Sequence, residues 1–272
     1  MLLALGRFPL TIQEDAGAGI VLPENWQKKA PALCPKSGGA ELRLEEDVLP
    51  AAADLPEGWS VFPEKDGKRA VYCRQRKPVF SLLYGADRRD VTVQAAPSNA
   101  KDKRIGLQFG MLVALSRHCV GLHGATLLCG NEIVILSAPS GTGKTTLAGL
   151  LEEHLGAITI NGDLALLSIE GERVIFEPTP FCGTSGRCLD HRLAVDRVVF
   201  LSQATEDRWR EMSGREAMAA FLSNAFVPTF DEALLWPIRD NIARCAARLK
   251  FSAFSFAPGR RAAEVFLQHI DH

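Results

Sequence analysis

The sequence predicts an α/β domain over residues 103–272, preceded by a smaller β-rich domain over residues 1–102. The first hundred residues are dense in proline and glycine, with short strand-like runs between them and little helical periodicity. Beyond them, apolar strand patterns and amphipathic helix patterns follow one another, which is typical of α/β proteins. A chain of 272 residues with 47% apolar content is long enough for two such domains.

In the first domain the clearest pattern is a hairpin. Residues 59–62 and 70–73 are strand-like and flank the turn-forming pair Asp66-Gly67. Residues 79–84 and 90–94 predict two further strands. The apolar residues 1–5 break at Gly6-Arg7 and lack the basic start of a signal peptide, so we interpret them as a first strand.

The second domain begins with a predicted amphipathic helix over residues 104–117. Ser213 and Glu216 have the spacing of a capping box and predict the start of a helix that runs to Phe226. A further helix is predicted from Lys144 to about His154. The predicted strands of this domain are residues 122–128, 132–138, 157–160, 164–169, 195–201 and 249–256.

Composition excludes several function classes. The 31 basic and 32 acidic residues nearly cancel, so no global field favours nucleic acid or an anionic membrane surface. The sequence contains no run of about 18 apolar residues, so no transmembrane helix is predicted. Seven cysteines without paired CxxC spacing fit a reducing cytoplasm better than a disulfide framework or a zinc site; these are Cys34, Cys73, Cys119, Cys129, Cys182, Cys188 and Cys245.

Residues 138–145, Ala-Pro-Ser-Gly-Thr-Gly-Lys-Thr, match the P-loop pattern apart from an alanine in the first position. Glycines let successive backbone N–H groups point at phosphates, the lysine reaches the β- and γ-phosphates, and the hydroxyl binds Mg²⁺. The motif lies between a predicted apolar strand and a predicted helix, which is the expected context. It predicts ATP and Mg²⁺ as ligands, held by Ser140, Gly141, Thr142, Gly143, Lys144, Thr145 and Thr146.

A second carboxylate near the loop is expected for the metal, because Mg²⁺ prefers oxygen ligands. Asp163 is the candidate, since it follows a predicted strand in the tripeptide Asn161-Gly162-Asp163. Thr145 and Asp163 would then share the ion. The alternative is that Asp163 only caps a turn of common loop composition.

With His123-Gly124 upstream of the loop, residues 122–166 resemble the catalytic core of the HPr kinase/phosphorylase family. That family carries a His-Gly pair at the same separation from the P-loop lysine, and an Asp-Asp pair beyond the following helix. A weaker resemblance continues downstream, so that about two thirds of the chain is covered. The resemblance implies the fold of the HPr kinase and phosphoenolpyruvate carboxykinase group for the second domain.

The chain departs from the family at the acidic pair. The family's metal-binding aspartate maps to Asp163, whereas the general base and acid maps to Gly162, which puts phosphorolysis in doubt. His123 is the candidate replacement base, because an imidazole titrates near neutral pH. The alternative is a histidine packed in a strand. Catalytic roles are thus assigned to His123, Lys144, Asp163 and Arg187.

Two downstream residues complete the candidate site. Arg187 ends a segment with two glycines and two hydroxyls, a mixture suited to an anion, although a surface loop is an equal alternative. Glu177 lies near the position of a family acid and could assist the metal, or could be an exposed residue at a strand end. Cys182 and Cys188 are expected to be ordinary thiols because no partner set of histidines or cysteines accompanies them.

The resulting hypothesis is an ATP-dependent kinase that phosphorylates a hydroxyl, with a serine in a peptide or protein as the first choice. The family resemblance favours a divergent branch, such as the enzymes that modify ribosomally made peptides. A small-molecule kinase and a non-catalytic nucleotide-binding regulator are the alternatives. No nucleic-acid or membrane partner is expected. The family resemblance implies a possible homo-oligomer, because members of that family form homo-oligomers.

Overall fold

The structure is a computed structural model that describes residues 2–5, 8–14, 40–46, 55–95 and 100–270. Within these residues the chain forms two units, each with its own β-sheet. Residues 1–117 and 228–237 make the first unit, and residues 118–227 and 238–272 make the second. No helix among the described residues has both the length and the apolar content needed to span a membrane.

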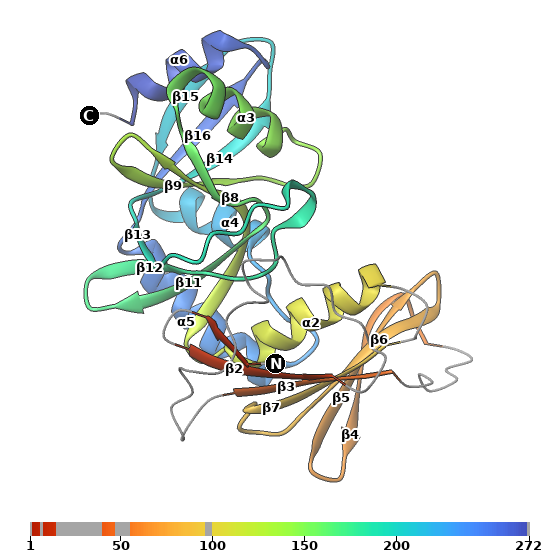
Figure 1. The fold of residues 1–272 in the computed structure, drawn as a ribbon. Helices are drawn as coiled ribbons and strands as arrows, with labels where there is room; N and C mark the ends of the chain where they lie inside the picture. The colour runs from red at the N-terminus through yellow and green to blue at the C-terminus, as the bar shows by residue number, and fades with distance from the viewer. Residues whose placement is uncertain (1, 6–7, 15–39, 47–54, 96–99, 271–272) are drawn as a thin grey trace. The chain divides into compact units, whose positions relative to one another are not determined.

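The first unit contains a seven-stranded sheet in the order β1-β2-β3-β7-β6-β5-β4. Helix α2 (Ala100–Ala114) packs on β3, β6 and β7, and Figure 1 shows it lying along one face of the sheet. The predicted hairpin is confirmed: β4 and β5 pair antiparallel, and Lys65-Asp66 forms the two-residue turn before Gly67. The strands are β1 (Leu2–Leu5), β2 (Phe8–Glu14), β3 (Ala40–Glu46), β4 (Gly58–Glu64), β5 (Gly67–Arg74), β6 (Lys77–Tyr84) and β7 (Asp90–Ala95).

The second unit is built on a nine-stranded mixed sheet in the order β13-β12-β11-β8-β9-β14-β16-β15, with β10 paired to β8. Strands β9, β14 and β16 run parallel to one another at its centre. The strands are β8 (Cys119–Cys129), β9 (Glu132–Ser137), β10 (Ile158–Asn161), β11 (Leu164–Glu170), β12 (Arg173–Glu177), β13 (Leu193–Val195), β14 (Arg197–Gln203), β15 (Arg208–Met212) and β16 (Lys250–Phe256).

Alternating side chains of the central strands enter two separate cores, as the twofold period of a strand requires. Ile133 and Ile135 of β9 enter one core with helices α4 (Gly214–Asn224) and α5 (Glu232–Ala246). Val134 and Leu136 enter the other core with α3 (Lys144–Leu155) and α6 (Arg260–Gln268), which lie together in Figure 1. Burial on both faces explains why residues 132–138 are so apolar.

Some elements have bounds that differ from the predicted ones, and other elements were not predicted. The domain boundary was predicted after residue 102, whereas the first unit continues to residue 117. The reason is that α2 packs on the first sheet. Ser213 is the N-cap residue of α4 without a side-chain cap hydrogen bond, and Glu216 instead pairs with Arg210. Among the described elements without a predicted counterpart are β2, β3, β12, β13, β15, α5 and α6. Cys34 and the break at Gly6-Arg7 lie outside the described residues.

Candidate active site

A glycine-rich loop, residues 138–143, joins the end of β9 to the start of α3. The predicted strand, loop and helix around it are therefore confirmed. Gly141 and Gly143 have φ of 81° and 106°, in the left-handed region that glycine adopts without strain. Helix α3 then begins at Lys144, so the partial positive charge of its N-terminus lies at the end of this loop.

Lys144 folds back over the loop that precedes it. Its Nζ donates hydrogen bonds to the carbonyl oxygens of Ala138 at 2.7 Å and Pro139 at 3.2 Å. The same Nζ lies 2.9 Å from Nε2 of His123. Burial lowers the pKa of the Lys144 ammonium, and the Asp163 carboxylate offsets part of that effect. The loop thus surrounds a buried amine, and none of the described carboxylates is bonded directly to it.

His123 lies in β8, and Leu164 of β11 faces it across the strand pair. Its Nε2 faces Lys144, while its Nδ1 lies 3.5 Å from Oδ1 of Asp163. Burial, and then the Lys144 charge, lower the pKa of the His123 imidazole below 6.5, whereas Asp163 acts in the opposite direction. An ammonium can only donate, so Nε2 accepts from Lys144 and the ring proton lies on Nδ1, toward Asp163.

Asp163 occupies the turn between β10 and β11. Asn161, which is fully buried, fixes this turn because its Oδ1 accepts hydrogen bonds from the backbone N–H groups of Asp163 and Leu164. The carbonyl of Asp163 accepts a further bond from the N–H of Gly124. The structure therefore brings His123, Lys144 and Asp163 together, although they come from three different elements.

The remaining loop residues present polar groups at the surface. Ser140, Gly141, Thr145 and Thr146 are exposed, and Thr142 and Gly143 are half-buried. Among the described residues, no cluster of three or more His, Cys, Asp or Glu side chains forms a ready metal site. The Thr145 hydroxyl and the Asp163 carboxylate nonetheless fit Mg²⁺, which binds few protein oxygens and keeps several waters and substrate phosphates as ligands.

Glu177 ends β12 and is fully buried, not exposed at a strand end. Its Oε1 accepts a hydrogen bond from the Ser168 hydroxyl at 2.7 Å, and Arg192 donates to both of its oxygens at 2.9 and 3.1 Å. The carboxylate is therefore well satisfied by protein donors. Its role as a metal ligand stays a prediction.

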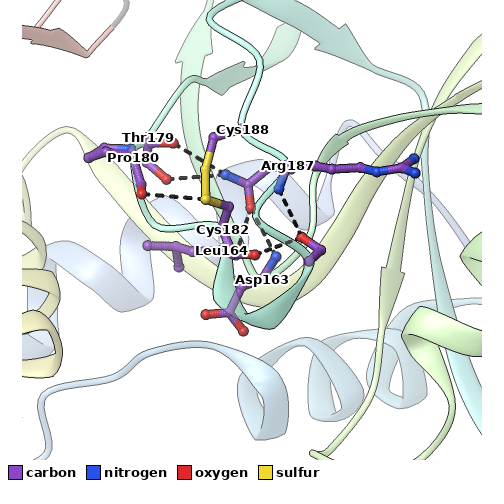
Figure 2. The surroundings of a disulfide bond; sticks show 9 residues. Asp163, Leu164, Thr179, Pro180, Cys182, Arg187 and Cys188 are labelled. Carbon is purple, nitrogen blue, oxygen red and sulfur yellow. Dashed lines mark hydrogen bonds between the residues drawn. A yellow bond between two sulfur atoms is a disulfide. The ribbon is translucent and has the colours of Figure 1, made fainter. Parts of the chain in front are cut away.

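The expectation of free thiols at Cys182 and Cys188 is wrong, because the two residues form a disulfide. The chain turns back through Gly183 and Gly186, both with positive φ, and brings the two Cα atoms to 5.3 Å, well inside the range that a disulfide bridges. Figure 2 shows the bond beside the turn that carries Asp163. A spacing of six residues without CxxC gave no signal of this pairing.

Arg187 lies on the same loop, and its side chain points away from Asp163 in Figure 2. The side chain is more than half exposed, and its guanidinium forms an ion pair with Glu152 of α3. Its predicted role as a phosphate contact stays a prediction.

The disulfide-closed loop fills the space beside Gly162. A Cβ atom added at Gly162 would overlap the Ser185 side chain, lying 2.7 Å from its Cβ and 3.1 Å from the carbonyl oxygen of Cys182. The sequence did not predict a role for Ser185 or Asn161 in the site. Asn161 was visible as the first residue of an Asn-Gly-Asp turn, whereas the approach of Ser185 depends on the fold.

The site defines the second unit as a mixed α/β unit with a glycine-rich loop between a central parallel strand and a helix. The chain matches no family model and no curated protein significantly. Its structure is similar to that of the HPr(Ser) kinase/phosphatase from Coxiella burnetii, with a TM-score of 0.33 and 11% identity over 56% of this chain and 93% of that chain. At these values the likeness does not establish a family.

Proposed function

We propose that this chain binds ATP with Mg²⁺ on residues 138–146 and transfers the γ-phosphoryl group to a hydroxyl, with a serine of a peptide or protein as acceptor. The observation that carries the proposal is the chain of contacts from Lys144 Nζ through His123 to Asp163. A buried ammonium at the start of a helix, beside a glycine-rich loop, is a favourable partner for a phosphate group.

In the proposed reaction Lys144 exchanges its bonds with His123 and with the loop carbonyls for bonds with phosphate oxygens. This exchange frees Nε2 of His123, which is unprotonated because the ring proton lies on Nδ1. Nε2 then accepts the proton of the acceptor hydroxyl, while the hydroxyl oxygen bonds to the γ-phosphorus and the bond to the ADP oxygen breaks. Asp163 faces Nδ1 and stabilises the imidazolium that forms.

Magnesium, held by Thr145 and Asp163, would neutralise charge on the phosphates. Asp163 then has two roles, as a metal ligand and as the acidic neighbour of His123. Glu177 and Arg187 would join the metal and the phosphate only after leaving their partners Arg192 and Glu152. We place this activity in the cytoplasm, with no nucleic-acid or membrane partner.

Incubation with γ-labelled ATP, Mg²⁺, free serine and a library of serine-containing peptides tests the proposal. We expect labelled peptide from the wild type and a loss of about 10²-fold or more in His123→Gln and Asp163→Asn. The exposed residues His154 and Asp240 provide the matched controls His154→Gln and Asp240→Asn, which should keep full activity. Label on free serine alone would indicate a small-molecule kinase, and ATP binding without transfer would indicate a regulator.

A further inference from the structure

The loop between Cys182 and Cys188 packs directly on the turn that carries Asp163. We infer that this disulfide-closed loop positions the Asp163 carboxylate for the metal, so that Cys182, Cys188 and Gly183 are positioning residues of the site. The inference rests on the proposed function, because it concerns the metal that Asp163 would bind. It assigns a role to a disulfide that the mechanism above does not use.

The first contact is between Gly183 and Asp163 itself. A Cβ atom added at Gly183 would lie 2.8 Å from Cβ and 3.0 Å from Cγ of Asp163. Gly183 also has φ of 59°, a conformation that costs L-residues free energy. The backbone of Gly183 therefore packs closely against the Asp163 side chain, and a larger residue at position 183 would displace the carboxylate.

The second contact is between Ser185 and Gly162 of the same turn. Ser185 fills the space beside Gly162, as described above. Its hydroxyl donates a hydrogen bond to the carbonyl of Cys182 at 2.7 Å and accepts one from the N–H of Arg187 at 3.2 Å. Gly183 and Ser185 of the loop thus contact Asp163 and Gly162 of the turn, respectively.

The disulfide ties this loop to the sheet. Cys188 forms an isolated antiparallel bridge with Asn161, and the N–H of Leu189 donates to the carbonyl of Ile160 at 2.7 Å. The end of the loop is therefore anchored at β10, next to the Asp163 turn. The disulfide links Cys188 to Cys182, the residue directly before Gly183, so Cys182 is also connected to β10 (Figure 2).

Breaking the bond should loosen the loop without unfolding the unit. Gly183 and Gly186 leave the backbone free to reorient, while hydrogen bonds and the Arg187–Glu152 ion pair still attach the loop. A dithiol supplies the two electrons: its thiolate attacks one sulfur, Cys182 and Cys188 each take up a proton, and the dithiol becomes a disulfide. In a reducing compartment the bond would be reversible, as most disulfides there are.

The inference predicts a selective loss of the metal contribution to nucleotide binding. We would titrate a non-hydrolysable ATP analogue into the oxidised wild type and into the Cys182→Ser/Cys188→Ser variant, with EDTA and with Mg²⁺. With EDTA both proteins should bind equally. With Mg²⁺ the gain in affinity should be lower in the variant by about 10-fold or more, as for other changes to residues that orient metal ligands.

Three controls keep the outcomes distinct. Cys129→Ser, which alters a buried thiol of the same unit outside the disulfide, should keep the full Mg²⁺ gain. Dithiothreitol should reproduce the loss in the wild type and have no effect on the Cys182→Ser/Cys188→Ser variant. Gly183→Ala, with the disulfide intact, should lose the same gain because it displaces Asp163.

An equal Mg²⁺ gain in the oxidised wild type, the reduced wild type and Gly183→Ala would overturn the inference while leaving the proposed function intact. Absence of nucleotide binding by the oxidised wild type under both conditions would instead refute the proposed function. Equal binding in EDTA shows that a variant is folded, so a misfolded variant cannot imitate the predicted result.

Discussion

Nζ of Lys144 lies 2.9 Å from Nε2 of His123, and this contact determines which nitrogen of the imidazole can take up a proton. Because the ammonium only donates, His123 must accept at Nε2 and is held in its neutral form. The pair therefore keeps a base unprotonated beside the loop until Lys144 finds another partner.

The first prediction concerns the pKa of His123. Burial and the Lys144 charge lower it below 6.5, and Asp163 partly opposes them. Lys144→Met should therefore raise this pKa, and Asp163→Asn should lower it further. Titration of the imidazole signals by NMR, with the His123 signal assigned from its absence in His123→Gln, measures both shifts. A wild-type pKa at or above 6.5 would contradict the proposed hydrogen-bond pattern.

The second prediction concerns the stability of the first unit. Asp231 is buried and accepts hydrogen bonds from the Tyr84 hydroxyl at 3.0 Å and from Lys68 at 2.7 Å. Tyr84→Phe leaves one carboxylate oxygen without this donor, so we expect the free energy of unfolding to fall by about 1–3 kcal/mol. Urea titration followed by tryptophan fluorescence reports it, because Trp59 stacks on Phe230 in this unit.

A matched change tests the specificity of that effect. Tyr72 is only half-buried, so Tyr72→Phe removes a hydroxyl at a less enclosed position of the same sheet. It should change the stability by less than about 0.5 kcal/mol. Equal effects of Tyr72→Phe and Tyr84→Phe would show that the hydrogen bond to Asp231 adds nothing specific to the free energy of unfolding.

The third prediction concerns the fit between Gly162 and Ser185. Gly162→Ala places a methyl group against the Ser185 side chain and should destabilise the second unit by about 1–3 kcal/mol. Ser185→Gly removes the obstructing atoms, so the double variant should recover part of the loss. A double-mutant cycle measured by thermal unfolding gives the coupling. Strict additivity of the two changes would argue against this packing.

The fourth prediction separates two carboxylates proposed for the metal. Glu177 is bonded to Ser168 and Arg192, so Glu177→Gln should lower the free energy of unfolding by about 1.5–3 kcal/mol. Its effect on the Mg²⁺ dependence of nucleotide binding should be small, whereas Asp163→Asn should remove that dependence. If Glu177→Gln removes it as well, Glu177 is a ligand and must exchange Arg192 for the ion.

Much of the second unit could be predicted from its sequence, because β9 and α3 carry strong local patterns on both sides of the glycine-rich loop. The proximity of His123 and Asp163 followed from the family resemblance, not from local pattern. Helix α5 carries Pro237 in its interior, which is a helix-breaking signal, and it has no predicted counterpart. The Cys182–Cys188 bond depends on the turn geometry at Gly183 and Gly186, which composition does not encode.

The most direct test of the central claim is a calorimetric titration of the intact protein with ATP and Mg²⁺, repeated with Lys144→Ala. The account predicts saturable one-to-one binding by the wild type and a loss of affinity of about 100-fold or more in Lys144→Ala, because the buried ammonium is the principal charge facing the phosphates. Absence of heat with the folded wild type, or equal affinity in Lys144→Ala, would contradict it.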